Sequence, residues 1–286
     1  MRFFINTIIF NLLVIYSYNL FALELKVVTY NIRQDLDHWS ERVGPLTSEI
    51  LQVDPDIIFL QEVKVSKNQI EQIINEMDAI DPSKKHTYYT YQDVKPGLFK
   101  LSGEGLAILS KFPLSDFEYI TLDSILGRFA LKAQVTIDDK TKIDLYNLHL
   151  DFMWNGFRNA EIKRLFKTIN EKPDKGNSII LGGDFNSIPT SYVVKKVLEN
   201  NFKDSYELFN GNQTENLGKT ISVDTKKFGI PIEKSLKQRI DYLFFNENNS
   251  SKLFQVTDAY TIGFQEISRG LHPSDHLGIF IKLNIN

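Results

Sequence analysis

The chain contains no cysteine, and this absence excludes several kinds of chemistry. Without a thiolate, neither a cysteine nucleophile nor a cysteine-ligated zinc or iron–sulfur site can form. Disulfides are excluded as well, so the stability of the fold must come from a hydrophobic core. Hydrophobic residues make up 42% of the 286 residues and charged residues 24%, which is typical of a globular protein.

The sequence also lacks an excess of positive charge. It has 33 lysines and arginines against 36 aspartates and glutamates, which gives a net charge of −3. A protein that binds nucleic acid passively needs a broad basic surface, so this class of function is disfavoured. A nuclease is not excluded, because a bound cation and a few local arginines can meet the phosphate.

Low-complexity runs, evident internal repeats and linkers rich in Gly, Ser or Pro are absent too. We therefore interpret residues 23–286 as one domain. Residues 1–22 differ, because Arg2 is followed by a mostly apolar stretch that ends at Ala22, as in a secretory signal peptide. We expect an exported protein, secreted or periplasmic, that keeps no stable membrane span after cleavage. An uncleaved membrane anchor is the alternative.

Apolar patterns along the chain predict a mixed α/β fold. Helices are expected over residues 40–53, 66–77 and 157–170. In the second of these, Ser66 and Gln69 match a capping box. Strands are expected over residues 24–30, 56–60, 106–109, 119–122, 129–137, 143–148, 178–181, 240–245, 253–260 and 277–283. Two halves of this kind suggest two packed sheets covered outside by helices. Residues 203–235 are rich in Gly, Asn, Lys and Thr and are predicted to be a loop.

Acids, amides and imidazoles stand where the apolar runs stop. Asn31, Glu62 and His149 each end such a run, and Asp184 and Asn186 follow another in the segment GGDFNS. Carboxylate and amide oxygens are hard ligands that suit Mg²⁺, and histidines act as acid–base groups. The set therefore suits metal-assisted attack of water on a phosphate ester. Each residue alone has a plain structural reading, such as an Asx turn.

Histidine needs a partner that fixes its tautomer, and two pairs are available. His276 stands next to Asp275 at the start of the last predicted strand, and Asp241 is the candidate partner of its ring. Glu104, between two glycines, is the candidate partner of His149, although its segment reads equally well as a turn.

Several segments together resemble the endonuclease/exonuclease/phosphatase superfamily with its deoxyribonuclease I-like fold. They are TYNIR, DPDIIFLQEV, EGLAILSKFP, GRFALK, NLHLD, IILGGDFNSIP, RIDYLFF and SDHLGIFI, which run from about residue 26 to 283. The resemblance implies a four-layer sandwich of two β-sheets flanked by helices. It also implies a Mg²⁺-dependent phosphoesterase, with Mn²⁺ as a second option, that hydrolyses phosphodiester bonds in the manner of a deoxyribonuclease.

The resemblance assigns a role to each motif position. The implied metal ligands are Glu62, Asn31 and Asp275. The implied catalytic residues are His149, Asp184, Asn186, Asp241, His276 and Glu104. The implied phosphate contacts are Arg33 and Arg128.

Other substrates and functions remain open at this stage. The same chemistry can act on an inositol phosphate or a phospholipid, as in a sphingomyelinase-like enzyme, and the fold can serve as a toxin subunit. Exposed aromatics would favour a lipid. Trp39, Phe152, Met153, Trp154 and Phe157 lie beside motif positions, and packing in the core is their alternative reading. We expect a monomer acting on nucleic acid or on one of these phosphate esters.

Overall fold

The computed structural model of the chain describes residues 23–96, 101–122, 126–139, 141–171, 176–211, 218–222, 236–247, 253–268 and 271–286. The predicted leader over residues 1–22 lies outside this part, as does much of the segment 203–235. Among the described helices, none is both long and apolar enough to cross a membrane.

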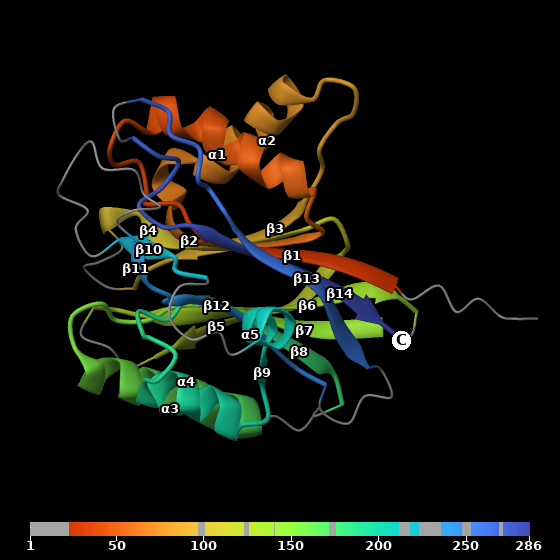
Figure 1. Cartoon of the computed structure of the whole chain (residues 1–286), viewed down its shortest axis with the longest axis vertical. Coiled ribbons are helices and arrows are strands. Elements are labelled where there is room, and N and C mark those ends of the chain that lie inside the picture. The colour runs from red at the N-terminus through yellow and green to blue at the C-terminus, as the bar shows by residue number, and fades with distance from the viewer. Residues whose placement is uncertain are drawn as a thin grey trace, which may run out of the picture.

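Two six-stranded sheets lie face to face, and helices cover their outer surfaces (Figure 1). The first sheet has the order β13-β14-β1-β2-β4-β3. Its strands are β1 (Leu23–Asn31), β2 (Ile57–Lys64), β3 (Tyr89–Val94), β4 (Glu104–Ser110), β13 (Phe254–Ile262) and β14 (Gly278–Ile285). The predicted four-layer sandwich is thereby confirmed.

The second sheet has the order β5-β6-β7-β8-β12-β9. Its strands are β5 (Leu114–Thr121), β6 (Phe129–Asp138), β7 (Thr141–His149), β8 (Ser178–Asp184), β9 (Lys203–Asp204) and β12 (Asp241–Asn246). A separate pair is formed by β10 (Ile221–Ser222) and β11 (Leu236–Gln238).

The outer layers are helical. The first sheet is covered by α1 (Trp39–Val53) and α2 (Gln69–Ile80). The second sheet is covered by α3 (Asn155–Glu171) and α4 (Tyr192–Glu199). The short α5 (Ser205–Asn210) lies against β12 and β13. A short 3₁₀ turn, η1 (Val65–Lys67), precedes α2. Figure 1 shows both helix pairs on opposite sides of the sandwich.

Strand alternation creates the layers, because successive side chains point to opposite faces of a sheet. In β2, Ile57 and Phe59 lie in the core between the sheets, whereas Ile58 and Leu60 pack beneath α1 and α2. The apolar residues of the second sheet alternate in the same way between the central core and α3 and α4. These cores take the place of the disulfides that the chain cannot form.

The two sheets share one pattern of strand direction. β1 and β2 are parallel, and each has an antiparallel outer neighbour, β14 and β4. β7 and β8 are parallel in the second sheet, with β6 and β12 as antiparallel neighbours. In each sheet, therefore, the carboxyl ends of two parallel strands and the amino ends of their two antiparallel neighbours lie at the same end of the sheet.

All the predicted strands and helices are present, but some local predictions are wrong. The capping box is one of them: Ser66 lies in η1, Asn68 precedes α2 without a side-chain cap, and Gln69 accepts a hydrogen bond from the backbone of Lys64 instead. The strand β3 and the helix α4 were not predicted. Part of 203–235 is not loop, because β9, α5 and β10 lie within it.

Candidate active site

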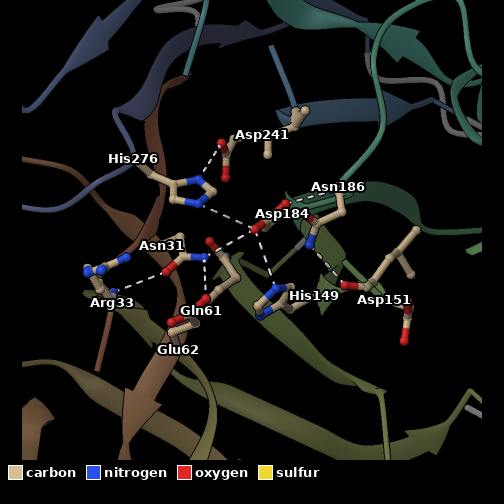
Figure 2. A network of polar contacts seen from close by, with 12 residues as sticks. Asn31, Arg33, Gln61, Glu62, His149, Asp151, Asp184, Asn186, Asp241 and His276 are labelled. Carbon is tan, nitrogen blue, oxygen red and sulfur yellow. Dashed lines mark hydrogen bonds and ion pairs between the residues drawn. The ribbon is translucent and has the colours of Figure 1, made fainter. Parts of the chain in front are cut away.

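The predicted site residues meet where the strands of both sheets end. Asn31 ends β1, His149 ends β7, Asp184 ends β8 and Asp241 begins β12. All four continue the alternation of the side chains that face the other sheet, such as Leu25 and Val27 in β1. Their side chains therefore converge at the mouth of the sandwich, as Figure 2 shows.

Asp184 is the centre of the polar network in Figure 2. Its Oδ2 accepts a hydrogen bond from Asn31 Nδ2 at 3.1 Å and lies 3.4 Å from His149 Nε2 and 3.8 Å from His276 Nε2. Burial, and then the charge of Asp241, raises the pKa of Asp184 to about 7. A buried carboxyl group poised near neutrality can accept a proton from water.

The pKa values of the two histidines beside Asp184 are shifted in opposite directions. Burial and the positive charges of Arg128 and Lys95 lower the pKa of His149 well below its usual value. Burial acts in the same direction on His276, but the negative charges nearby, above all that of Asp241, outweigh it and raise the pKa of His276 well above its usual value. Groups whose pKa values are pushed apart in one site are suited to opposite acid–base roles.

The predicted pair of His276 and Asp241 is present. Nδ1 of the buried His276 ring lies 2.9 Å from Oδ2 of Asp241, which is itself fully buried. Thr220 holds this pair in place, because its Oγ1 accepts hydrogen bonds from the backbone amides of Ile240 and Asp241 and its carbonyl accepts one from Leu277. The segment predicted as a loop thus supports the site.

Glu62 reaches the site through a break in strand geometry. Regular alternation would point it towards the helices, as it does Leu60. A bulge between Gln61 and Val63 leaves Glu62 unpaired, with φ of 53°, and its Oε1 accepts a hydrogen bond from Asn31 Nδ2 at 3.1 Å. Bulges often redirect a side chain beside an active site. Burial and the charge of Asp275 raise the pKa of Glu62 above its usual value.

Asp275 and Arg33 lie next to this carboxylate. The guanidinium of Arg33 contacts the carboxylates of both Asp275 and Asp37. Figure 2 shows Arg33 on the same side of the network as Glu62. The structure therefore brings Arg33 to the site with its charge already balanced by two acids.

The residues at the mouth fit a hard divalent cation. Glu62, Asn31 and Asp275 offer oxygen donors, and the two carboxylates lie close enough for the charge of Asp275 to raise the pKa of Glu62. Ligand atoms of Asp184, Asp241 and His276 also lie within 4.8 Å of one another. In that second group, however, the Nδ1 of His276 is already bonded to Asp241, so we assign it to acid–base work.

Glu104 is at the site, but its predicted pairing with His149 is wrong. Its Oε1 lies 2.5 Å from Lys95 Nζ and 3.6 Å from Arg128 Nη1, and no hydrogen bond joins it to His149 in the described part of the chain. The two cations outcompete a neutral imidazole for the carboxylate. All four side chains line one small pocket, with Leu106, Gly105 and Phe129.

Arg128 has unsatisfied donors in this pocket. The side chain is buried, yet its Nε and Nη1 have no hydrogen-bond partner among the described residues. Buried donors are rarely left unpaired unless a ligand or water completes them. Lys95, which no sequence motif marks, adds a second positive charge, although burial and Arg128 lower its pKa.

Asn186 closes the site on the side of the second sheet. Its amide donates to Asp184 Oδ1 at 2.8 Å, and its Nδ2 donates to the carbonyl of Leu150 at 3.1 Å. The preceding Gly183 has φ of 141°, and a Cβ there would come within 2.0 Å of the carbonyl oxygen of Leu148. Glycine is therefore required at this point, where the backbone of β7 comes too close for a side chain.

Arg42 holds the loop that carries Arg33, a role that no sequence motif indicates. The buried guanidinium donates to carbonyls at residues 32–34, 36 and 37, and to Pro273 at 2.6 Å. This loop contains Arg33 and Gln34 at positive φ, which unsupported side chains rarely adopt. Because Pro273 precedes Asp275 by two residues, Arg42 links both loops.

A buried polar link also joins the sheets below the mouth. Gln61 Nε2 donates to Asn147 Oδ1 at 2.8 Å, and Asn147 Nδ2 donates to the carbonyls of Leu60 and Ala107 in the first sheet. Polar Asn147 stands among apolar neighbours on a face of β7 that points to the core, and this pattern could have revealed it. The link ties β7 to the first sheet two residues before His149.

The aromatic residues near the motifs divide into two groups. Trp39 is almost fully buried, as its core reading predicts, and its Nε1 donates to Gln72 Oε1 at 2.7 Å. The core reading is wrong for Phe152, Met153 and Trp154, whose side chains are exposed.

Comparisons with known proteins agree on the fold. The family model described as the Endonuclease/Exonuclease/phosphatase family matches residues 28–276. Tyrosyl-DNA phosphodiesterase 2 of Rattus norvegicus is 25% identical over 270 residues, which cover 91% of this chain and 67% of that protein. The same protein of Homo sapiens is 25% identical over 276 residues, covering 91% and 68%.

Solved structures give the same result. The human Nocturnin catalytic domain with bound sulfate anion superposes with a TM-score of 0.70 at 20% identity, covering 93% of this chain and 96% of that one. D. rerio TDP2 complexed with single strand DNA product superposes with a TM-score of 0.69 at 19% identity, covering 91% and 99%. At these identities the likeness shows the fold.

Proposed function

The chain belongs to the Endonuclease/Exonuclease/phosphatase family, a family of phosphoric ester hydrolases, and from this premise we propose that it cleaves phosphodiester bonds in nucleic acid with the help of Mg²⁺ or Mn²⁺. The observation that carries the proposal is the arrangement around Asp184. The buried Asp184 carboxylate accepts a hydrogen bond from Asn31 and lies 3.4 Å from His149 Nε2 and 3.8 Å from His276 Nε2, and the surroundings shift the pKa values of the two imidazoles in opposite directions.

Each group in this arrangement has a defined task. Asp184, which Asn31 and Asn186 orient, accepts a proton from the attacking water. The cationic His276, held by Asp241, stabilises negative charge that develops on the phosphate. Neutral His149 donates a hydrogen bond on the other side, and Arg128 offers its free donors to a phosphate oxygen.

A divalent cation fits the donors of Glu62, Asn31 and Asp275. When bound, it supplies charge stabilisation to a non-bridging phosphate oxygen. Burial makes the negative charge of Glu62 costly, so a cation would offset that cost as well. The positive charge of Arg33 balances the negative charge of Asp275 and so limits the net negative charge at the mouth of the site.

Nucleic acid is the substrate that the relatives favour. Tyrosyl-DNA phosphodiesterase 2 is named for a DNA diester, and one structural neighbour holds a single-stranded DNA product. The net charge of −3 argues for few phosphate contacts and hence for recognition close to the scissile bond.

The purified chain can be tested with Mg²⁺ against four substrates. These are a single-stranded oligonucleotide, an oligonucleotide ending in a tyrosyl phosphodiester, sphingomyelin vesicles and a phosphoinositide. The proposal predicts cleavage of at least one oligonucleotide and loss of that cleavage in Asp184→Asn. The exposed variant Glu171→Gln, on α3, is the matched control and should behave as the wild type.

Two results would overturn the proposal. One is hydrolysis of a lipid or inositol substrate by the wild-type chain while both oligonucleotides stay intact. The other is full activity of Asp184→Asn on an oligonucleotide.

We also propose that the chain is exported, because Arg2 and the apolar stretch that ends at Ala22 have the form of a signal peptide. Expression of the full chain followed by cell fractionation and N-terminal sequencing tests this directly. A mature product that begins near residue 23 outside the cytoplasm is expected. An intact amino terminus on a cytoplasmic product would contradict the proposal.

A further inference from the structure

Three consecutive large apolar side chains are exposed at the rim of the site. Phe152, Met153 and Trp154 have 63%, 66% and 61% of their surface exposed. Nowhere else in the described part of the chain are three large apolar residues in a row exposed in this way. Most isolated exposed apolar residues need no explanation, but a contiguous group marks an interaction surface.

The loop that carries them is held firmly. Oδ1 of the buried Asp151 accepts hydrogen bonds from the amides of Met153 at 2.7 Å and Trp154 at 3.0 Å. The amide of Asp151 donates to Glu161 Oε2 at 2.8 Å, and Arg158 Nη1 donates to the Asp151 carbonyl at 2.9 Å. Exposed side chains on such a loop are already ordered before they meet a ligand, which lowers the entropic cost of binding.

The indole of Trp154 is fixed as well. It lies over Gly156, where a Cβ would come within 2.9 Å of the ring. Phe157 meets it edge to face, with ring centroids 5.0 Å apart and planes at 89°. One face of the indole is therefore supported from behind, while most of its surface stays open to solvent.

The loop begins inside the site. It continues β7 directly beyond His149, and Leu150 accepts a hydrogen bond from Asn186 Nδ2 and donates one to the carbonyl of Asp184. Figure 2 shows Asp151 at the edge of the same network. A group attached to a phosphate held beside His149 can thus reach the exposed rings without crossing the molecule.

The surroundings favour a nucleobase over a lipid as the occupant. A loop that docks on a membrane is commonly flanked by lysines and arginines that meet anionic lipid. The neighbours here are Asp151 and Asn155, and Arg158 is bonded to both of them. Base stacking suits a net acidic protein, because it adds affinity without a phosphate contact.

We infer that Phe152, Met153 and Trp154 form a stacking surface for an unpaired base next to the scissile phosphate. The inference rests on the proposed function and names the part of the substrate that this surface receives. It predicts a preference for single-stranded over blunt duplex ends, since an unpaired base can turn onto the rings without first breaking its pairing and its stacking on the next base.

Intrinsic fluorescence gives a readout that does not depend on catalysis. The chain has two tryptophans, and Trp39→Phe leaves Trp154 as the one source of tryptophan emission. A short single-stranded oligonucleotide, added in EDTA so that it is not cleaved, should quench this emission. A blunt duplex of equal length should quench it several-fold less at the same concentration.

Kinetics with a cleavable oligonucleotide provide the second readout. Trp154→Ala should raise KM about tenfold with little change in kcat, and Trp154→Phe should restore most of the loss, as expected for one lost stacking contact. Leu253→Ala is the matched control, because Leu253 is similarly exposed but lies beside Asn286, beyond the end of β14 remote from His276. It should leave KM unchanged.

The outcomes separate this inference from the proposed function. Cleavage of oligonucleotides by the wild type without any quenching, or with an unchanged KM in Trp154→Ala, would overturn the stacking surface alone. A blue shift of the emission on phosphatidylcholine vesicles without quenching by the oligonucleotide would assign the loop to a membrane instead. Failure of the wild type to cleave any nucleic acid would overturn the proposed function itself.

Discussion

The two sheets bring different chemistry to the same edge. The first sheet ends in oxygen donors, Asn31 on β1 and Glu62 on β2. The second ends in groups that exchange protons, His149 on β7 and Asp184 on β8. The same strand pattern therefore yields one half whose oxygen donors can bind a cation and another whose side chains can transfer a proton. Neither half is a complete site.

The halves are joined by a few contacts that cross the sandwich. His276 enters from the first sheet, just before β14, but its ring pairs with Asp241 of the second. Asn31 likewise reaches over to Asp184, and Gln61 meets Asn147 below. The site therefore depends on how the two sheets are aligned. Variants should fall into three kinds: those of the oxygen donors of the first sheet (the cation side), those of the proton-exchanging groups of the second sheet (the proton side), and those of residues that bond across the two sheets (the crossing contacts).

The crossing pair should show the largest effect. His276→Ala should lower turnover by about 10²-fold or more, because a positioned acid–base group and a positive charge are lost together. Asp241→Asn should follow in the same direction, since it removes the partner that orients and charges the ring. Steady-state kinetics on the cleaved substrate measure both. A silent Asp241→Asn beside an inactive His276→Ala would disprove the pairing.

Removing the support of the cation-side loops should cost less. In Arg42→Lys the charge stays, but one ammonium group cannot satisfy the six carbonyls that the guanidinium bonds. We expect turnover to fall about tenfold or more through misplacement of Asn31 and Asp275, together with a lower melting temperature. An unchanged turnover in a variant with a lower melting temperature would reduce Arg42 to a purely structural role.

Much of the second-sheet half could be predicted from the sequence, and the reason is strand alternation. His149 and Asp184 extend apolar patterns that already say which face points to the core. Glu62 was predicted at the site, but the bulge that turns it there was not, because no residue type marks it. The Glu104 pairing failed because Lys95, which follows β3 and faces Glu104 across the β3–β4 hairpin, takes the carboxylate.

Glu62→Gln tests the cation side specifically. The amide keeps the size of the side chain but loses its charge, so the Mg²⁺ concentration for half-maximal turnover should rise about tenfold. His149→Ala, on the proton side, should lower turnover at saturating Mg²⁺ and leave that concentration nearly unchanged. The two sheets would not divide the work as described if both variants shifted Mg²⁺ dependence equally.

The smallest effect is a difference in protonation between the two imidazoles. In the metal-free chain, nitrogen NMR between pH 6 and 7.5 should find His149 neutral and His276 cationic throughout.

The raised pKa means that His276 adds stability that is fully present below its unfolded pKa and is lost as the pH rises through the folded pKa. Protonation of His149 opposes folding, so its contribution falls as the pH drops below about 6.5. Equal titration of both rings near pH 6.5 would contradict the assignment.

The most direct test of the whole account is cleavage of a single-stranded oligonucleotide before and after removal of divalent cations. The account predicts that the chain loses cleavage after exhaustive EDTA treatment and dialysis and recovers it on addition of Mg²⁺ or Mn²⁺. It also predicts that Asp241→Asn stays severely impaired at every Mg²⁺ concentration, because the proton-side half is then misaligned. Full cleavage by the EDTA-treated chain would contradict the central claim that both halves are needed.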